Sequence, residues 1–208
     1  MNQLTRHKRL RVLVRELNQQ RKQQGQKIDI LCHDLITAQR EFIKRLEQIS
    51  FTSMFYRSML GVSDVDTVLH IAGTFFSDML PDARVYCWIK RNPKWDCRLL
   101  WDGFQIEHES EALERYFSDE VIQDICLSRH CCALGDCVQK GLSISAEIEA
   151  RYSVAVLPLF DKWRSVGAIL IYGDSEHPLE NKNIERIEYV TSGLSKAIET
   201  CLASSQPS

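Results

Sequence analysis

The 208-residue sequence has no long apolar run, no cluster of glycines and no Cys-x-x-Cys pair. No stretch approaches the ~18 consecutive apolar residues that a membrane-spanning helix requires. The nine glycines are scattered, so there is no Gly-rich loop of the kind that cradles a nucleotide phosphate. A Gly-x-Ser-x-Gly elbow and a paired catalytic carboxylate signature are also missing, which argues against nucleophilic and acid–base hydrolysis.

The N-terminal residues lack the apolar core and the small-residue cleavage site of a secretory signal. We therefore expect a cytoplasmic protein, in which the eight cysteines are free thiols or ligands rather than a disulfide framework. Residues 1–50 hold 11 Lys and Arg against 5 Asp and Glu, whereas the remainder holds 15 against 23. Because the basic arm lacks interleaved aromatic residues, we interpret it as a solvated helix face and do not expect nucleic acid as a partner.

Residues 1–60 carry apolar side chains at steps of three or four, which predicts a long helix with a coiled-coil seam. The seam consists of Leu10, Leu13, Leu17, Ile28, Leu31, Leu35, Ala38, Phe42, Leu46, Ile49 and Tyr56. The polar segment 18–27, which contains Gly25, is expected to weaken the helix between a short basic part and a strong part from about residue 28 to 60. Since no partner for this stripe lies nearby in sequence, we expect a homodimer through the helix.

Residues 61–203 predict an α+β domain, followed by a disordered tail at 204–208. Strands are expected over 83–90, 97–101, 153–160 and 165–172, with a final helix over 181–202. Both faces of the last two strands are apolar, whereas an antiparallel sheet usually leaves one face wet. Helices from the two chain ends can cover one face, so loops and a short helix between Asp102 and Tyr152 must cover the other. Such a roofed face favours a small-molecule cavity.

Position and chemistry select seven candidates for the lining of that cavity. They are Trp88, Trp101, Phe104, Phe117, His130, Cys132 and Tyr152. The sequence identifies neither the ligand nor a cofactor. It does not identify the protein that receives the signal either, although a signalling protein is one option.

The segment CLSRHCCALGDC, residues 126–137, gathers four cysteines and a histidine. Four residues separate Cys126 from Cys131, and four separate Cys132 from Cys137. This spacing occurs within zinc ligand pairs, so a metal or haem site is one hypothesis. Its candidate ligands are Cys126, His130, Cys131 and Cys137. Packed free thiols are the simpler interpretation, because cysteine buries readily. A thiol redox switch is the third.

Several phrases resemble those of GAF domains: VLPL at 156–159, GAIL at 167–170, Leu179, and the segment 128–137 with Asp136 at an aspartate position. The resemblance covers about residues 50–202 and implies a ligand-sensing or dimerising regulatory module of signalling proteins, with helical linkers. It implies no particular ligand, because the residues that should follow Asn181-Lys182 in the cyclic-nucleotide branch are missing. The alternatives are a thiol-dependent reductase, as in the methionine sulfoxide reductase branch, and a ligand-free assembly adaptor.

Overall fold

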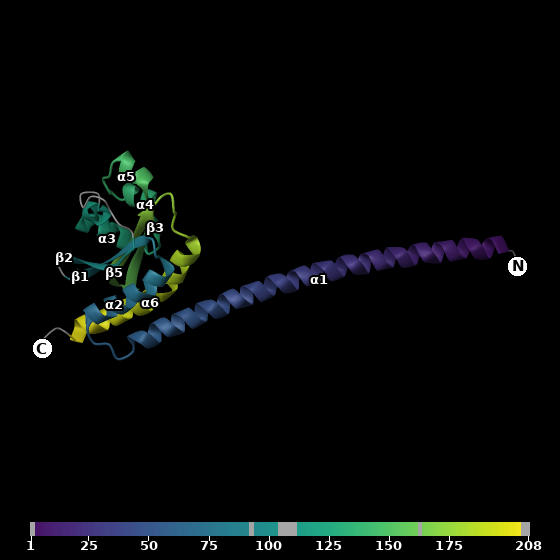
Figure 1. Ribbon diagram of the computed structural model, residues 1–208, viewed down its shortest axis with the longest axis horizontal. Helices are drawn as coiled ribbons and strands as arrows, with labels where there is room; N and C mark the ends of the chain where they lie inside the picture. The colour runs from purple at the N-terminus through teal and green to yellow at the C-terminus, as the bar shows by residue number, and fades with distance from the viewer. Residues whose placement is uncertain (1–2, 92–93, 104–111, 162–163, 205–208) are drawn as a thin grey trace. The chain divides into compact units, whose positions relative to one another are not determined.

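The computed structural model describes residues 3–91, 94–103, 112–161 and 164–204 (Figure 1). The candidate Phe104 and almost all of the expected tail therefore lie outside the described residues. The chain divides into two compact units, Met1–Ser50 and Phe51–Ser208. In the part of the chain that the structure describes, no helix is both long and apolar enough to cross a bilayer.

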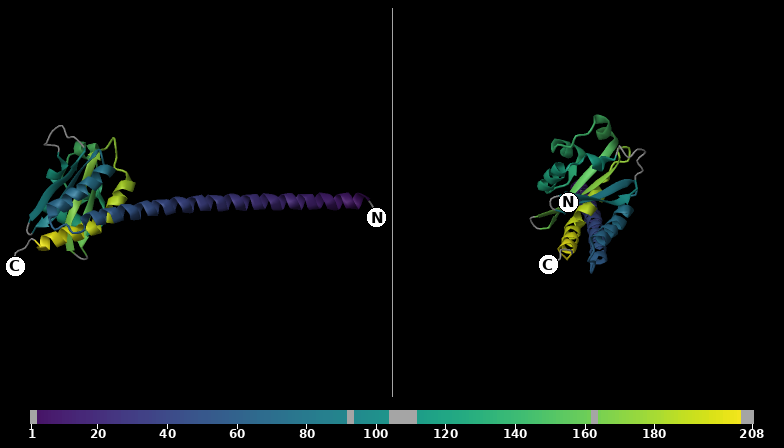
Figure 2. Two further views of the ribbon diagram at one scale, coloured as in Figure 1. Left: turned by 60° about the horizontal axis from the view of Figure 1, so that its bottom comes forward. Right: turned by 90° about the vertical axis from the view of Figure 1, so that its left-hand side faces the viewer.

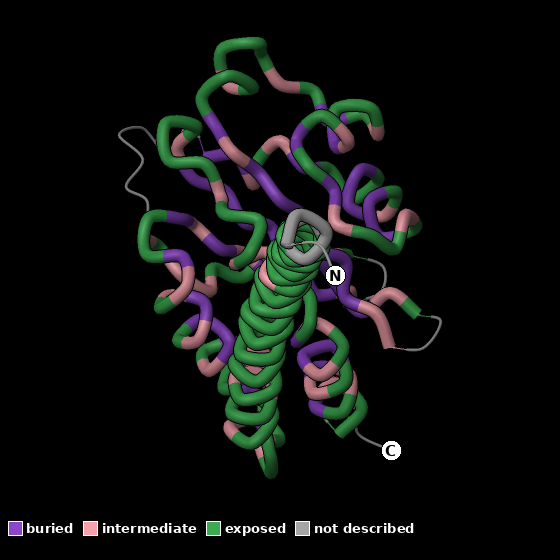
Figure 3. The backbone as a smooth tube through the Cα atoms, turned by 90° about the vertical axis from the view of Figure 1, so that its right-hand side faces the viewer, coloured by how far each residue is buried: buried purple, intermediate pink, exposed green. Residues whose placement is uncertain are grey.

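One helix, α1 (Gln3–Met59), makes up the first unit and ends within the second. The weak segment expected around Gly25 does not interrupt it, because the neighbouring Gln, Lys and Arg residues are good helix formers and one glycine costs only about 1 kcal/mol. Gly61 follows the helix with a φ of 78°, the left-handed conformation typical of a helix stop. The seam side chains of the first unit are exposed, Leu35 by 70%, and Figure 3 shows this exposure along the helix.

The second unit contains the remaining elements. They are α2 (Val65–Met79), β1 (Ala83–Arg91), β2 (Lys94–Asp102), the 3-10 helix η2 (Leu113–Tyr116), α3 (Asp119–Ser128), β3 (Cys132–Ala133), α4 (Leu134–Gln139), α5 (Ala146–Arg151), β4 (Tyr152–Asp161), β5 (Arg164–Asp174) and α6 (Asn181–Ser204). Asp64 caps α2, since its carboxylate accepts a 2.8 Å hydrogen bond from the Thr67 amide. The α+β prediction is confirmed.

The five strands form one antiparallel sheet in the order β2-β1-β5-β4-β3. Residues 51–59 of α1, with α2 and α6, cover one face, which we call the helix-covered face. The other face, here the roofed face, lies under η2, α3 and α4. Figure 2 shows the two groups of helices on opposite sides of the sheet. Both faces are therefore sheltered, as the two-sided apolar strands predict.

Candidate ligand-binding face

Four of the seven predicted pocket residues lie together on the roofed face. Trp88, Phe117, Cys132 and Tyr152 are all buried in its core, and Trp88 is only 2% exposed. The ring centroids of Trp88 and Phe117 are 4.9 Å apart. These side chains therefore fill the deep part of the face themselves.

The structure places Trp101 and His130 elsewhere. A register shift lets Tyr86 pair with Leu99 and Val85 with Trp101, so this irregularity turns Trp101 toward the helix-covered face. There its indole nitrogen donates a 2.9 Å hydrogen bond to the Leu80 carbonyl oxygen. His130 is exposed, and its Nδ1 lies 2.7 Å from the Ser128 carbonyl oxygen. The sequence pattern carried no signal for the shift.

A polar group that the sequence did not single out lies on the roofed face: the tyrosine cluster, formed by Tyr86, Tyr152, Tyr172 and Glu114. The Tyr172 hydroxyl donates a 2.6 Å hydrogen bond to Glu114 Oε2. The Tyr86 ring stacks on Tyr172 at 6.3 Å, and the Tyr152 ring meets it edge-on at 5.6 Å. Tyr86 and Glu114 are half-buried, so the cluster has a rim that a ligand can reach. Strand alternation from Trp88 points to Tyr86, whereas nothing marks Glu114 within its acidic stretch.

Burial and the neighbouring Glu114 keep the Tyr86 and Tyr172 phenols protonated at neutral pH. Burial raises the pKa of Tyr86 and of Tyr172, and the Glu114 carboxylate raises both further. Arg84 is held by a two-pronged ion pair with Asp102, with 2.8 Å between Nη2 and Oδ2. The Arg84 guanidinium also reaches the Tyr172 hydroxyl and lowers the pKa of both phenols, but by less than burial and Glu114 raise it.

Cys97 lies beside this cluster, since it pairs with Trp88 across β1 and β2. The residue as a whole is exposed, but its sulfur is partly buried. This burial, and next the Glu114 charge, raise the pKa of the thiol to about 11. At neutral pH Cys97 is therefore a thiol and a poor nucleophile.

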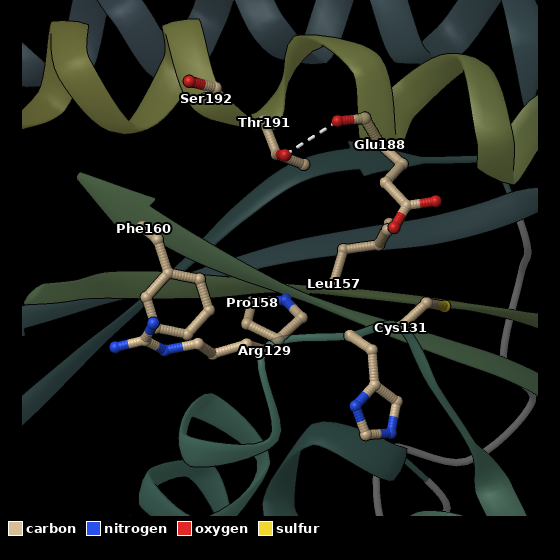
Figure 4. Close-up of a pocket in the computed structure, with 9 residues that line it drawn as sticks. Arg129, Cys131, Leu157, Pro158, Phe160, Glu188, Thr191 and Ser192 are labelled. Carbon is tan, nitrogen blue, oxygen red and sulfur yellow. Dashed lines mark hydrogen bonds between the residues drawn. The ribbon is translucent and has the colours of Figure 1, made fainter. Parts of the chain in front are cut away.

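A hollow of about 300 Å³ opens between β4, α6 and the segment after α3 (Figure 4). In Figure 4, Glu188 of α6 faces Cys131 and Pro158 across it, and the Thr191 hydroxyl donates a 2.8 Å hydrogen bond to the Glu188 carbonyl oxygen. Burial, and next the Glu188 charge, raise the pKa of Cys131 to about 11. This hollow thus holds a protonated thiol at neutral pH.

The four candidate metal ligands lie apart. The Cys126 thiol donates to the Gly167 carbonyl oxygen at 3.4 Å, and Cys137 is buried with its pKa raised to about 12 by that burial. Cys131 packs instead against the core of the helix-covered face, and His130 faces solvent. Within the described ranges, no group of three or more His, Cys, Asp or Glu residues is arranged to hold a metal ion. The metal hypothesis stays a prediction for which these residues supply no assembled donor set.

No protein-family model matches the sequence, and no curated protein matches it. Solved structures do match: the GAF domain of a phosphoenolpyruvate-protein phosphotransferase from Coxiella burnetii has a TM-score of 0.54 at 13% identity, covering 76% of this chain and 96% of that one. The fold is GAF-like. A segment of a methyl-accepting chemotaxis protein has a TM-score of 0.51 at 15% identity, covering 74% of this chain and 99% of that one.

The similar structures also include enzymes. A free methionine-R-sulfoxide reductase from Neisseria meningitidis, in complex with its substrate, has a TM-score of 0.50 at 14% identity, covering 76% of this chain and 91% of that one. At these identities the likeness shows the GAF-like fold alone, which hosts binding modules and enzymes, so the function has to be argued from this chain's own residues.

Proposed function

We propose that this chain is a regulatory module that binds a small amine-bearing ligand at the tyrosine cluster and signals through a dimer of α1 helices. The observation that carries the proposal is the half-buried Glu114 carboxylate, set among aromatic rings on a face that is otherwise apolar. The Tyr172 hydroxyl donates a hydrogen bond to this carboxylate but brings no positive charge, and a cationic ligand would supply it.

The chemistry of the cluster suits an ammonium group. Glu114 supplies the opposite charge, and the half-buried Tyr86 ring supplies cation–π attraction of about 0.5–2 kcal/mol. The Tyr86 hydroxyl is protonated and can also contact an oxygen atom of the ligand, whereas the Tyr172 hydroxyl donates its hydrogen to Glu114. The ligand class is therefore a small amine that carries a hydroxyl or a carbonyl oxygen.

Strand β1 connects this cluster with the helices. Tyr86 and Trp88 point to the roofed face, whereas Val85 and Ile89 pack against the helices on the other face. A shift of β1 on ligand binding is therefore passed to α2, α6 and the last turns of α1. Phe55 anchors those turns, since it is completely buried among neighbouring phenylalanine rings.

The stripe on α1 supports a dimer. The seam advances 36 residues from Leu10 to Leu46 in ten steps if Gln20 and Gln24 are included, which is 3.6 residues per step. This period equals that of a straight α-helix, whereas a heptad seam of 3.5 imposes a left-handed supercoil. The two glutamine positions align with themselves in a parallel pair, which fixes the register. We infer two nearly straight, parallel helices.

The ligand test is thermal stability of the full chain in a panel of primary amines and their neutral hydroxyl analogues. An amine that binds should raise the melting temperature, and both Glu114→Gln and Tyr172→Phe should remove most of that rise. Tyr189→Phe is the matched control, because Tyr189 is exposed on α6. An equal rise in Glu114→Gln would contradict the role of the carboxylate.

The dimer test is disulfide formation under mild oxidation in Leu10→Cys and in Ile49→Cys, each with Cys32→Ser. A parallel pair links each variant to itself, because equal positions face each other. An antiparallel pair links only a mixture of variants that carry cysteine at opposite ends of the stripe, and a monomer links neither.

An assembly adaptor is a second candidate, favoured by the packing of Trp88 and Phe117 into the space that a deep ligand would need. In that case the amine panel leaves the melting temperature unchanged while the dimer persists. Thiol catalysis has less support, because the pKa values of Cys97, Cys131 and Cys137 are all raised, and the thiolate is the reactive form.

A further inference from the structure

A second hollow, of about 570 Å³, opens at the end of the sheet where α3 ends and β5 begins. We call it the basic hollow, because Lys90, Arg129 and Arg164 line it together with Gln123 and Ser165. None of the described residues that line it is acidic. It stands out because residues 51–208 carry 15 basic against 23 acidic side chains, so a concentration of positive charge runs against the charge of this unit.

Arg129 is held in an unusual backbone conformation at this place. It ends α3 with a φ of 57° and a ψ of 17°, and it is the only non-glycine residue of the described chain with a positive φ. Glycine adopts this left-handed conformation without strain, whereas residues with a side chain are strained in it, and such strain clusters at functional sites. The Arg129 guanidinium stacks over the Phe160 ring at 5.5 Å, which fixes the side chain at the wall of the hollow.

The other groups of the basic hollow are also positioned. The Lys90 amine donates a 2.9 Å hydrogen bond to Gln123 Oε1 and lies 5.4 Å from the centroid of the Trp95 ring. An ammonium has three donor hydrogens, so this bond leaves donor capacity for a ligand. Lys90 is thus oriented without being neutralised by Gln123.

Ser165 supplies an unsatisfied hydroxyl. Its buried Oγ has no hydrogen-bond partner of ordinary geometry among the described residues, although it approaches the Cys126 thiol. That thiol donates its own hydrogen to the Gly167 carbonyl oxygen. Sulfur is a weak acceptor, so the Ser165 hydroxyl can turn from the Cys126 sulfur to a stronger acceptor in the hollow.

We propose that the basic hollow binds a dianionic phosphate group, held by Lys90, Arg129, Arg164 and the Ser165 hydroxyl. Arginine forks and a lysine point charge are the usual partners of phosphate oxygens. The hollow is larger than a phosphate ion, and sites of 300–1,000 Å³ hold small organic ligands, which favours a small phosphate monoester. The site lies apart from the tyrosine cluster, because Ser165 and Tyr172 are seven residues apart on β5, roughly 23 Å along a strand.

Arg129 has a simpler role to be tested against this proposal. A cation at the C-terminal end of α3 compensates the exposed carbonyl groups of the helix, with no ligand involved. Arg129→Gly separates the two roles. Glycine removes the backbone strain, so the melting temperature without ligand should rise or hold. If Arg129 contacts phosphate, the same variant should lose affinity for phosphate, a loss that unfolding cannot explain.

The experiment measures binding of inorganic phosphate and of glycerol 3-phosphate to the full chain, by calorimetry and thermal shift, against chloride at matched ionic strength. We expect Arg129→Gly and Arg164→Gln each to weaken phosphate binding about tenfold or more, as the loss of a charge-assisted hydrogen bond does. Ser165→Ala should weaken it by less. Lys182→Gln, which removes an exposed cation of α6 outside the hollow, should change it by less than about twofold.

Three results would overturn the proposal: phosphate no better than chloride, unchanged binding in Arg129→Gly, or an equal loss in Lys182→Gln, which would show general screening. Tighter binding of the ester than of inorganic phosphate supports a metabolite, and equal binding supports free phosphate. Glu114→Gln should leave phosphate binding intact, so this test does not depend on the amine ligand.

Discussion

Replacing Gly73 by alanine should destabilise the second unit, although the same change usually stabilises a helix. Gly73 lies in the interior of α2, where alanine is favoured over glycine by about 1 kcal/mol. An added Cβ would lie 2.3 Å from the Leu100 carbonyl oxygen of β2, whereas ordinary contacts begin at 3.4 Å. The obstacle is backbone, so no side-chain rotation relieves it, and α2 has to move by about 1 Å.

The substitution should be destabilising overall, because overpacking costs more free energy than the gain in helix propensity returns. Overpacking of a well-packed core costs about 1–3 kcal/mol, and a clash with backbone belongs in the upper part of that range. After the gain in helix propensity of about 1 kcal/mol, a net loss of about 1–2 kcal/mol remains. For a unit of this size that loss lowers the melting temperature by about 2–8 °C.

The assay is thermal unfolding of the full chain followed by near-ultraviolet circular dichroism, which reports on the aromatic core of the second unit. Gly25→Ala is the matched control: it is the same substitution inside a helix, with nothing within 4 Å of the new Cβ. It should increase the helicity of α1 and leave the second unit unchanged. A rise in the melting temperature of Gly73→Ala would refute the close packing of α2 on β2.

Three further predictions concern the core, the tyrosine cluster and the thiols. Phe55→Ala should cost the second unit about 3–5 kcal/mol in chemical denaturation, since the ring is fully buried, whereas Phe42→Ala on the exposed stripe should leave that unit's midpoint unchanged. Folding raises the pKa of Tyr172, so its contribution to the free energy of unfolding is complete below about pH 10, the pKa of the unfolded state, and falls as the pH rises further. Tyr172→Phe should reduce this alkaline loss of stability, as measured by denaturant midpoints across that pH range. Thiol titration of the native protein should label Cys32 first and Cys97 more slowly, with rapid labelling of Cys137 as the contrary result.

The alternation of side chains predicts that both faces of the sheet are covered, but not the order of its strands. Val85 and Ile89 reach one core and Trp88 the other, as period-two reasoning requires, and the covering of both faces follows from that pattern. Period-two alternation does not predict the side of the sheet on which Trp101 lies. The register shift before Trp101 inserts one residue into β2 and reverses the orientation of its side chain.

The segment after α3 shows a second reason for the difference between sequence and structure. Alternation over 131–134 predicts a strand, but only Cys132 and Ala133 pair with β4. The strand ends there because α4 begins at Leu134. The Asp136 carboxylate stabilises this helix start by accepting a 3.0 Å hydrogen bond from the Ala133 amide. Glu114 is harder still to predict: its partner Tyr172 is 58 residues away, and only the tertiary structure brings the two together.

Both proposed sites depend on one row of side chains along β1. Tyr86, Trp88 and Lys90 alternate onto the roofed face, with the tyrosine cluster at one end of the row and the basic hollow at the other. Trp88 stands between them, packed against Phe117 and almost completely buried. Because a close-packed core does not deform continuously, a ligand at either end acts on the other end only if it repacks Trp88. Any such coupling is reciprocal: an amine that strengthens phosphate binding must be bound more tightly, by the same factor, in the presence of phosphate.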